Sequence, residues 1–397
     1  MPAFTPGEFA ARIEKLQREL SQRAIDLLVL NENSDLYYYT GSVQPLYLLV
    51  PAQGQPVVLA RKSITRIQQE VLHLPLCPFL GTKDLVAILT ERGLTGAKRV
   101  AFTQDTTAYA TVKRFQALLP EAEIVDFSWE IRALRMVKSA EELAIMRQAG
   151  AIHARMPEVL REAFTPGMTE VALSAALEQY FRLNGHGALI RCRREGIEMA
   201  GFGVCTVGEN ALVGTKFDGI CGGKGLSPAM PFGATADPIR PNEPIIADFS
   251  FTLEGYHSDL TRMCCWGTPS EEVQRAYDAM VRIQRTLFDS MRPGQSWESV
   301  YLQSVQMAEE AGYADVYMGV GTEQVRFVGH GLGLELDEPP FLAPKMPAPL
   351  EAGMVIALEP KVALPGIGVV GIEDSAIIHE DGVEITTDCP TEIVRLK

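Results

Sequence analysis

Two aspartates, Asp248 and Asp259, lie in a stretch that is typical of a β-hairpin, and their spacing brings two carboxylates together. The run from Ile245 to Phe251 is rich in residues that favour strands, Glu254-Gly255 provides a turn, and Tyr256 begins a second strand. A pair of carboxylates at short distance is a pattern that can bind a metal ion or share a proton.

The register of the hairpin depends on where its turn is centred. A turn centred on Leu253-Glu254 places Asp248 directly opposite Asp259, whereas a turn centred on Glu254-Gly255 makes them diagonal neighbours. In both registers the two side chains share a face, at about 5–8 Å between Cβ atoms. Carboxylates at that distance repel each other unless a proton or a cation lies between them. The alternative is that both are ordinary aspartates beside a turn.

Three later motifs supply further candidate ligands. His330 lies in the segment GHGLG, whose glycines let other groups approach the imidazole, while Glu359 ends the apolar run MVIALEP and Glu373 follows the apolar run GVVGI. Each also has a plainer interpretation: a loop histidine bonded to backbone, a solvated glutamate at a strand end, and a surface acidic pair, Glu373-Asp374. Together, however, four carboxylates and one imidazole at the ends of apolar strands are costly to bury unless they are neutralised.

The charge of this set predicts its cofactors. Four carboxylates carry four negative charges, and two divalent cations carry four positive ones. Oxygen ligands with one nitrogen suit Mn²⁺, Fe²⁺, Co²⁺ or Zn²⁺, and no thiolate is required. The sequence therefore predicts a site for two divalent metal ions (Mn, Co, Fe or Zn).

With this set of motifs the sequence resembles the pita-bread metallopeptidases, the family of methionine aminopeptidase, aminopeptidase P and prolidase. The resemblance covers roughly residues 137–397 and rests on five residues in the family's order: Asp248, Asp259 in GYHSDLTR, His330 in GHGLGL, Glu359 in ALEP and Glu373 in GIED. It implies that Asp248 chelates one metal, that His330 and Glu359 hold the other, and that Asp259 and Glu373 bridge the two. It also implies a metal-bridging hydroxide as nucleophile, with Glu359 as the catalytic proton shuttle.

The positions around these ligands depart from the family pattern. Members of the prolidase type carry a histidine in the loop before the first aspartate, and the corresponding segment, residues 208–219, contains none. The family's Glu-Pro-Gly becomes Glu359-Pro360-Lys361, and the arginine that precedes its final Ile-Glu-Asp becomes Gly371. These departures spare the metal ligands and change the substrate pocket.

Two further residues are candidates for substrate binding. A second family histidine, expected after the GHG motif, is replaced by Asp337, which could pair with a cationic substrate group or be a solvated loop residue. His257 precedes Asp259 by two positions and could face the same side of the strand.

The chain before these motifs reads as a separate domain. A helix opens at Thr5-Pro6-Gly7-Glu8 and runs to about Gln22, and strands and helices alternate after it, which favours a layered α/β domain. We see no metal-ligand cluster or phosphate loop in it, and it resembles the creatinase-type N-terminal domain of aminopeptidase P and prolidase. The predicted fold class is an α/β N-terminal domain (residues 1–132) followed by an α+β pita-bread catalytic domain (residues 133–397). The expected strands are 25–30, 46–50, 57–60 and 99–102, and the expected helices are 64–72 and 108–119.

Helix signals also mark the second domain. Ser139 with Glu142 three residues on forms a capping-box pattern, and Thr169 precedes a helix predicted over 170–183. Further helices are expected from near Ser270 and Ser296. The segment 201–238 is glycine-rich and is predicted to be a long irregular loop. From Val325 onward the pattern is that of strands.

Composition excludes several classes of partner. A net charge of −14 and a pI near 5.0 argue against nucleic acid, which requires a basic surface. No run of about 18 apolar residues predicts a membrane span, and the first twenty residues lack the pattern of a secretory signal. The seven cysteines are an odd number without C-x-x-C spacing, which favours a reduced, cytoplasmic protein.

These observations predict a metal-dependent exopeptidase of the Xaa-Pro aminopeptidase or prolidase type, acting on a peptide or other small-molecule substrate. The resemblance further implies a homodimer. Two alternatives remain open. One is a family relative that acts on a small non-peptide substrate as an amidohydrolase or lyase, and the other is a non-catalytic binding protein that reuses the fold.

Overall fold

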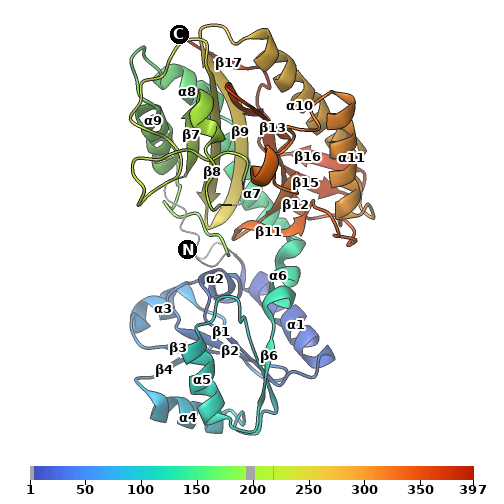
Figure 1. Cartoon of the computed structure of the whole chain (residues 1–397). Coiled ribbons are helices and arrows are strands. Elements are labelled where there is room, and N and C mark those ends of the chain that lie inside the picture. Colours follow the sequence, from blue (N-terminus) through green and yellow to red (C-terminus); the bar gives the residue numbers. More distant parts are fainter. Residues whose placement is uncertain (1–3, 194–201, 218) are drawn as a thin grey trace. The chain divides into compact units, whose positions relative to one another are not determined.

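The computed structural model describes residues 4–193, 202–217 and 219–397, and these form two compact units (Figure 1). The first unit runs to Arg135 and includes Arg193, and the second contains residues 136–192 and the described residues after 201. The domain boundary expected after residue 132 lies inside helix α6, Ser128–Met136. Within the described residues, no helix is both long and apolar enough to cross a membrane.

The first unit is a six-stranded sheet with the strand order β4-β3-β2-β1-β5-β6, in which β1 pairs antiparallel with β2 and parallel with β5. Helix α1 begins as predicted, because the Thr5 side chain accepts a hydrogen bond from the Glu8 backbone N–H. The strands are β1 Leu27–Leu30, β2 Tyr47–Pro51, β3 Val57–Ala60, β4 Leu76–Pro78, β5 Arg99–Phe102 and β6 Glu123–Asp126. The helices, besides α6, are α1 Pro6–Gln22, α2 Asn33–Thr40, α3 Ile64–Glu70, α4 Thr82–Glu91 and α5 Tyr109–Leu118.

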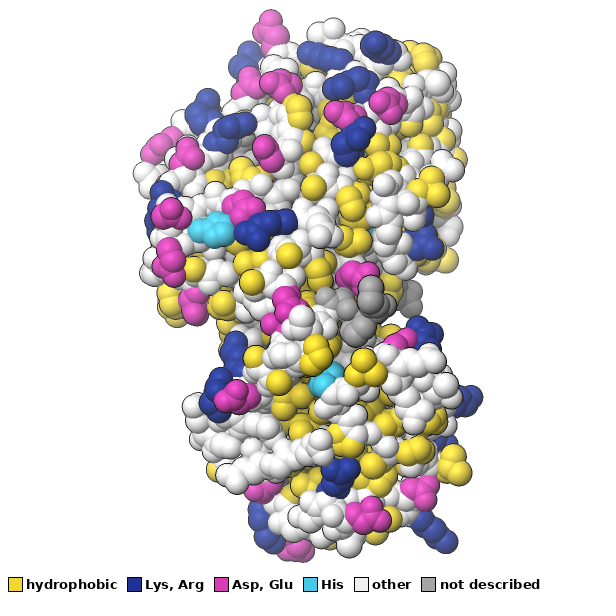
Figure 2. Space-filling view, turned by 180° about the vertical axis from the view of Figure 1, so that it is seen from behind, with side chains coloured by type: hydrophobic (Ala, Val, Ile, Leu, Met, Phe, Trp, Pro, Cys, Tyr) yellow, Lys and Arg dark blue, Asp and Glu magenta, His cyan; other side chains and the backbone are white. Residues whose placement is uncertain are grey.

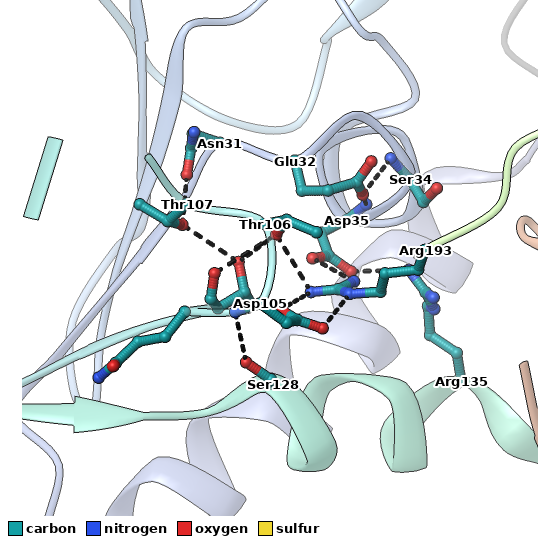
Figure 3. A network of polar contacts seen from close by, with 12 residues as sticks. Asn31, Glu32, Ser34, Asp35, Asp105, Thr106, Thr107, Ser128, Arg135 and Arg193 are labelled. Carbon is teal, nitrogen blue, oxygen red and sulfur yellow. Dashed lines mark hydrogen bonds and ion pairs between the residues drawn. The ribbon is translucent and has the colours of Figure 1, made fainter. Parts of the chain in front are cut away.

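A buried polar network joins distant parts of the first unit (Figure 3). Asp35, on α2, accepts hydrogen bonds at 2.7 Å from Arg135 and at 3.1 Å from Arg193. The Arg193 guanidinium also binds both carboxylate oxygens of Asp105, at 2.7 and 3.0 Å. Arg193 comes from the chain between helix α9 (Glu170–Leu183) and strand β7 (Gly203–Val207), yet it is part of the first unit. Asp35 and Asp105 therefore each face a cation of the chain.

The second unit is built on a nine-stranded sheet whose main path is β11-β10-β12-β15-β9-β8-β7. Strand β16 extends it from β15 and β17 pairs with β9, while β13 and β14 form a separate two-stranded sheet. The remaining strands are β8 Pro244–Leu253, β9 Tyr256–Trp266, β10 Gly329–Leu332, β11 Leu336–Phe341, β12 Val355–Leu358, β13 Lys361–Leu364, β14 Gly368–Gly371, β15 Glu373–His379, β16 Gly382–Ile385 and β17 Val394–Leu396.

Helices cover both faces of this sheet (Figure 1). Apolar residues of α8 (Met156–Ala163) and α9 form one core with Ile245, Phe249 and Phe251 of β8. Residues of α10 (Glu271–Ser290) and α11 (Trp297–Glu310) form another core with Ile246 of the same strand. Neighbouring residues of β8 thus point into different cores, as the alternation of side chains along a strand requires.

The helix starts predicted in the second unit are confirmed. Ser139 and Glu142 form a reciprocal capping box at α7 (Ala140–His153), and the Thr169 side chain caps α9. Ser270 and Ser296 cap α10 and α11 in the same way. The prediction of an irregular loop over 201–238 is wrong for its first part, because β7 pairs with β8 across the sheet. Gly201 and Asp218 lie outside the described residues.

The surface carries charges of both signs. On the face drawn in Figure 2, Lys and Arg side chains are interspersed with Asp and Glu side chains.

Candidate metal centre

The hairpin of β8 and β9 adopts the second of the two registers considered. Asp248 pairs with Thr261 and Ser250 pairs with Asp259, so the turn is centred on Glu254-Gly255 and the two aspartates are diagonal neighbours on one face. Both turn residues have positive φ, 49° and 84°, which matches the right-handed twist of a hairpin.

The order of strands in the sheet explains how five distant residues meet. The strands β10, β12, β15, β9 and β8 are successive neighbours. Each of them contributes one side chain at the same place: in that order His330, Glu359 directly after β12, Glu373, Asp259 and Asp248. The predicted ligand set is thus brought together, and all five residues line one pocket.

The glycines beside His330 are required by close packing. A Cβ atom at position 331 would lie 2.3 Å from the Pro339 carbonyl oxygen, and one at 329 would lie 2.3 Å from that of Ala357. Neither distance is compatible with a larger residue. The glycines allow β10 to lie close to β11 and β12, and this holds the imidazole against the carboxylates.

The distances within the cluster are those of groups that share a cation. The His330 Nε2 atom lies 3.8 Å from Asp259 Oδ2, 3.6 Å from Glu359 Oε1 and 3.9 Å from Glu373 Oε1. Asp259, His330 and Glu373 each offer a ligand atom, and these atoms all lie within 4.8 Å of one another. One divalent ion with mixed oxygen and nitrogen ligands fits this geometry.

Burial and mutual repulsion disfavour the charged forms of these acids. Burial, followed by the nearby charges of Glu373 and Asp248, raises the pKa of Asp259 well above its usual value. Burial also raises the pKa of Glu373, although the Lys361 ammonium opposes that shift. Burial alone would lower the pKa of His330, but the neighbouring carboxylates, Asp337 first, raise it. Such a cluster favours a bound cation.

The interpretation of Glu373-Asp374 as a surface acidic pair is wrong. Both side chains are buried, and they point in opposite directions because they are neighbours on one strand. Glu373 faces the pocket, whereas Asp374 accepts a hydrogen bond at 2.7 Å from Arg262. Asp374 is therefore already neutralised by a cation of the chain.

The two oxygens of Glu373 have different surroundings. The Oε2 atom accepts hydrogen bonds from Thr261 at 2.7 Å and from Lys361 at 3.0 Å. The Oε1 atom is buried and has no hydrogen-bond partner among the described residues. A buried carboxylate oxygen without a donor is costly, and a metal ion at the His330 side would satisfy it. The donor set thus fits a divalent ion on that side.

Asp337 and His257 have different settings. Asp337 lines the pocket with a positive φ of 61°, and its Oδ1 lies 3.4 Å from His330 Nδ1. His257 is buried, its Nε2 accepts from the Arg191 backbone N–H at 3.2 Å, and its Nδ1 donates to the Gly333 carbonyl at 2.9 Å. Both ring nitrogens of His257 are therefore engaged by backbone.

Sequence reasoning missed two residues of the site. Lys361 places its ammonium among the carboxylates, and Cys221 lines the same pocket as Asp248. Lys361 stands where the family pattern has glycine, which is a signal that the sequence contains. The sequence does not show, however, that the lysine side chain points into the pocket. Cys221 lies in the glycine-rich segment and carried no signal of its own.

Comparisons with known proteins agree with this geometry. The model of metallopeptidase family M24 matches residues 144–380, and that of the creatinase/prolidase N-terminal domain matches residues 12–137. An Xaa-Pro dipeptidase of Pyrococcus furiosus is 24% identical over 387 residues, covering 96% of this chain and 99% of the relative. A probable dipeptidase of Mycobacterium tuberculosis is 28% identical over 410 residues, covering 98% and 97%.

Solved structures share the fold over the whole chain. An Xaa-Pro dipeptidase from Bacillus anthracis superposes with a TM-score of 0.82 at 22% identity, covering 98% of this chain and all of the other. A prolidase from Pyrococcus horikoshii superposes with a TM-score of 0.80 at 21% identity, covering 97% of this chain and all of the other. The predicted order of a creatinase-type domain and a pita-bread domain is confirmed.

Proposed function

Because this chain belongs to metallopeptidase family M24, we propose that it is a metal-dependent exopeptidase of the Xaa-Pro aminopeptidase or prolidase type. The observation that carries the proposal is the convergence of four carboxylates and one imidazole from five neighbouring strands into a single pocket. The names of relatives, such as Xaa-Pro dipeptidase, support the substrate class.

The cofactor we propose is divalent metal of the Mn²⁺, Fe²⁺, Co²⁺ or Zn²⁺ kind. Asp259, His330 and Glu373 would hold an ion, with Glu359 beside them. The charge of the four carboxylates alone suits two ions, with Asp248 as a ligand of the second. A bound divalent ion would polarise the scissile carbonyl and make a nearby water more acidic.

The chain's own groups would handle the proton. Glu359 lies in the pocket, with Oε1 on the His330 side and Oε2 bound by Lys361 at 2.6 Å. A carboxylate in this position can accept a proton from the attacking water and return it to the leaving amine. The bond to Lys361 fixes the orientation of the carboxylate for both transfers.

Asp337 and His257 take separate roles in this proposal. Asp337 lines the pocket, where it can pair with a cationic group of the substrate, and it also lies beside the outer nitrogen of His330. His257 binds the backbone of Gly333 and thereby positions the segment that follows His330. We therefore assign His257 to support of the site instead of direct contact with substrate.

Quaternary state and compartment complete the proposal. We propose a homodimer on the basis of the family resemblance, to be tested by light scattering. We propose the cytoplasm because all seven cysteines are free thiols, four of them buried.

A non-peptide substrate is the second candidate. It is favoured by the lack of any histidine in residues 208–219 and by Asp337 standing where the family pattern has a histidine. An amide or small amino-acid derivative would then occupy the same pocket.

The test is turnover with Mn²⁺ against a panel of Xaa-Pro dipeptides, longer Xaa-Pro peptides and small amides. We expect release of the N-terminal residue before proline, and a decrease of about 10²–10⁴-fold in kcat/KM for Glu359→Gln. The control is Glu380→Gln, at an exposed position, which should leave the rate unchanged. Turnover of amides alone would favour the second candidate, and no turnover on the whole panel would contradict the peptidase assignment.

A further inference from the structure

The ammonium of Lys361 lies inside the group of acidic side chains. Its Nζ atom is 2.6 Å from Glu359 Oε2, 3.0 Å from Glu373 Oε2 and 3.1 Å from Asp248 Oδ2. The lysine side chain is only 1% exposed. An ammonium group has three N–H donors, and here three carboxylates are placed to receive them. The Lys361 ammonium is thus a buried cation inside the carboxylate cluster and not the end of a surface side chain.

This ammonium divides the cluster into two halves. One half contains Asp248 and the Oε2 atoms of Glu359 and Glu373, all in contact with Lys361. The other half contains His330 Nε2 and the oxygens around it, Asp259 Oδ2, Glu359 Oε1 and Glu373 Oε1, at 3.6–3.9 Å. The oxygen without a hydrogen-bond donor, Glu373 Oε1, belongs to this second half. Among the described residues, no Lys or Arg donates a hydrogen bond to the oxygens of this half.

The position of Lys361 is built into the backbone. Lys361 on β13 is directly opposite Gly371 on β14, and a Cβ atom at 371 would lie 2.3 Å from Lys361 Cγ. The family pattern has glycine at the first of these positions and arginine at the second, so the small and the basic residue have changed places across one strand pair. Gly371 leaves space for the aliphatic part of the Lys361 side chain, so the glycine at 371 and the lysine at 361 depend on each other.

A second divalent ion would compete with this group for the same oxygens. The resemblance assigns Asp248 and one oxygen of Glu373 to the first metal, and these are the oxygens that the ammonium contacts. An ion bound there would lie beside a buried positive charge of the same sign, where repulsion is weakly screened. The donor set on this side therefore does not fit a divalent ion while Lys361 is in place.

We propose that the Lys361 ammonium takes the place of one of the family's two metal ions, so that this chain binds a single divalent ion beside His330. This inference rests on the proposed function only in that the remaining ion is the cofactor of the same pocket. The ion is held by Asp259, His330, Glu373 and Glu359, and Asp248 serves as a partner of Lys361. The centre would then combine one Lewis acid with one fixed ammonium.

The experiment counts metal ions per chain. The purified full-length protein, the variant Lys361→Met and the double variant Lys361→Gly/Gly371→Arg are stripped of metal, saturated with Mn²⁺ and analysed by elemental analysis and electron paramagnetic resonance. We expect one ion per chain and the signal of isolated Mn²⁺ for the wild type. We expect two ions per chain and a spin-coupled signal for both variants. Lys345→Met, which removes an exposed lysine, should match the wild type.

The outcomes separate this inference from the proposed function. Two ions or no ion per chain in the wild type overturns the inference, whether or not the variants fold. One ion per chain in both a folded variant and the wild type also overturns it, because the lysine would then not be what limits the count. One ion in the wild type and two in the variants, without turnover of any peptide, supports the inference and contradicts the peptidase assignment.

Discussion

Two groups of carboxylates, one in each unit, are neutralised in different ways. In the first unit, Asp35 and Asp105 face the guanidinium groups of Arg135 and Arg193 at 2.7–3.1 Å (Figure 3). In the second unit, three of the four carboxylates contact the ammonium of Lys361, and one oxygen of Glu373 has no hydrogen-bond donor among the described residues.

The difference shows which buried acids indicate a cofactor. Where each acid has a cation of the chain, the network is complete and its role is structural. Where acids outnumber the cations, the surplus charge is tolerated only with a proton or an external cation. The metal centre is therefore recognised by its unbalanced charge and not by the presence of acids. Matched Asp→Asn variants in the two groups test this difference.

The largest effect is expected from Asp35→Asn. The substitution keeps the shape of the side chain and removes the charge between Arg135 and Arg193, so that both guanidinium groups lose their ion pair with Asp35 while Arg193 keeps its pair with Asp105. We expect the first unit to lose about 3–5 kcal/mol of its free energy of unfolding. Urea unfolding followed by hydrogen exchange in the peptides of this unit measures the loss.

The control for this variant is Glu123→Gln. Glu123 pairs with Arg99 at 3.0 Å, but the two side chains are 65% and 35% exposed, so the pair should contribute less than about 1 kcal/mol. If both variants lose the same small amount, the buried network is not the stabilising element we describe.

For Asp259→Asn in the metal-free protein we expect an increase in the free energy of unfolding instead of a loss. Burial and the nearby carboxylates oppose the charged form of Asp259. The amide keeps Oδ1 as acceptor from the Ser250 hydroxyl, at 3.1 Å, and from the Leu260 N–H, at 3.2 Å. We expect a gain of about 2 kcal/mol in the free energy of unfolding in the presence of a chelator.

With added Mn²⁺ the wild type should become more stable than Asp259→Asn, because the wild type gains the free energy of metal binding and the variant does not. Urea unfolding with chelator and with Mn²⁺ measures both parts. A metal-free Asp259→Asn protein that is less stable than the wild type would mean that the cluster is not under electrostatic strain.

Local pattern placed Asp248 and Asp259 on one hairpin and Glu359 and Glu373 directly after apolar runs, which made them candidate ligands. It left a plainer interpretation open for each of them, and the ligand roles came from the family resemblance. The sequence could not decide the hairpin register, since both turn positions satisfied the same alternation. The structure decides it through positive φ at both Glu254 and Gly255.

Contacts between segments that are distant in the sequence could not be predicted from local sequence patterns. Arg193 binds Asp35, which lies 158 positions earlier in the chain, and no periodic pattern in the sequence predicts such a pair. The orientation of Lys361 depends on the pairing of β13 with β14, which places it over Gly371. The short helix α2 was missed because its start depends on the Glu32 carboxylate, which accepts from the backbone N–H groups of Ser34 and Asp35.

The smallest of these effects, expected from Asp337→Asn, separates two roles for one residue. If Asp337 mainly orients His330 through the 3.4 Å contact with Nδ1, the loss of its charge should weaken Mn²⁺ binding about tenfold, the lower end for such groups because the contact is long. Asparagine tolerates the positive φ of 61° at this position, so the backbone should not change. Titration against a competing chelator measures the affinity, with Asp381→Asn at an exposed position as control.

If Asp337 instead binds a cationic substrate group, KM should rise while the Mn²⁺ affinity stays that of the wild type. That result would remove Asp337 from the metal centre and leave His330 to be oriented by its contact with the Gly331 carbonyl, at 3.2 Å.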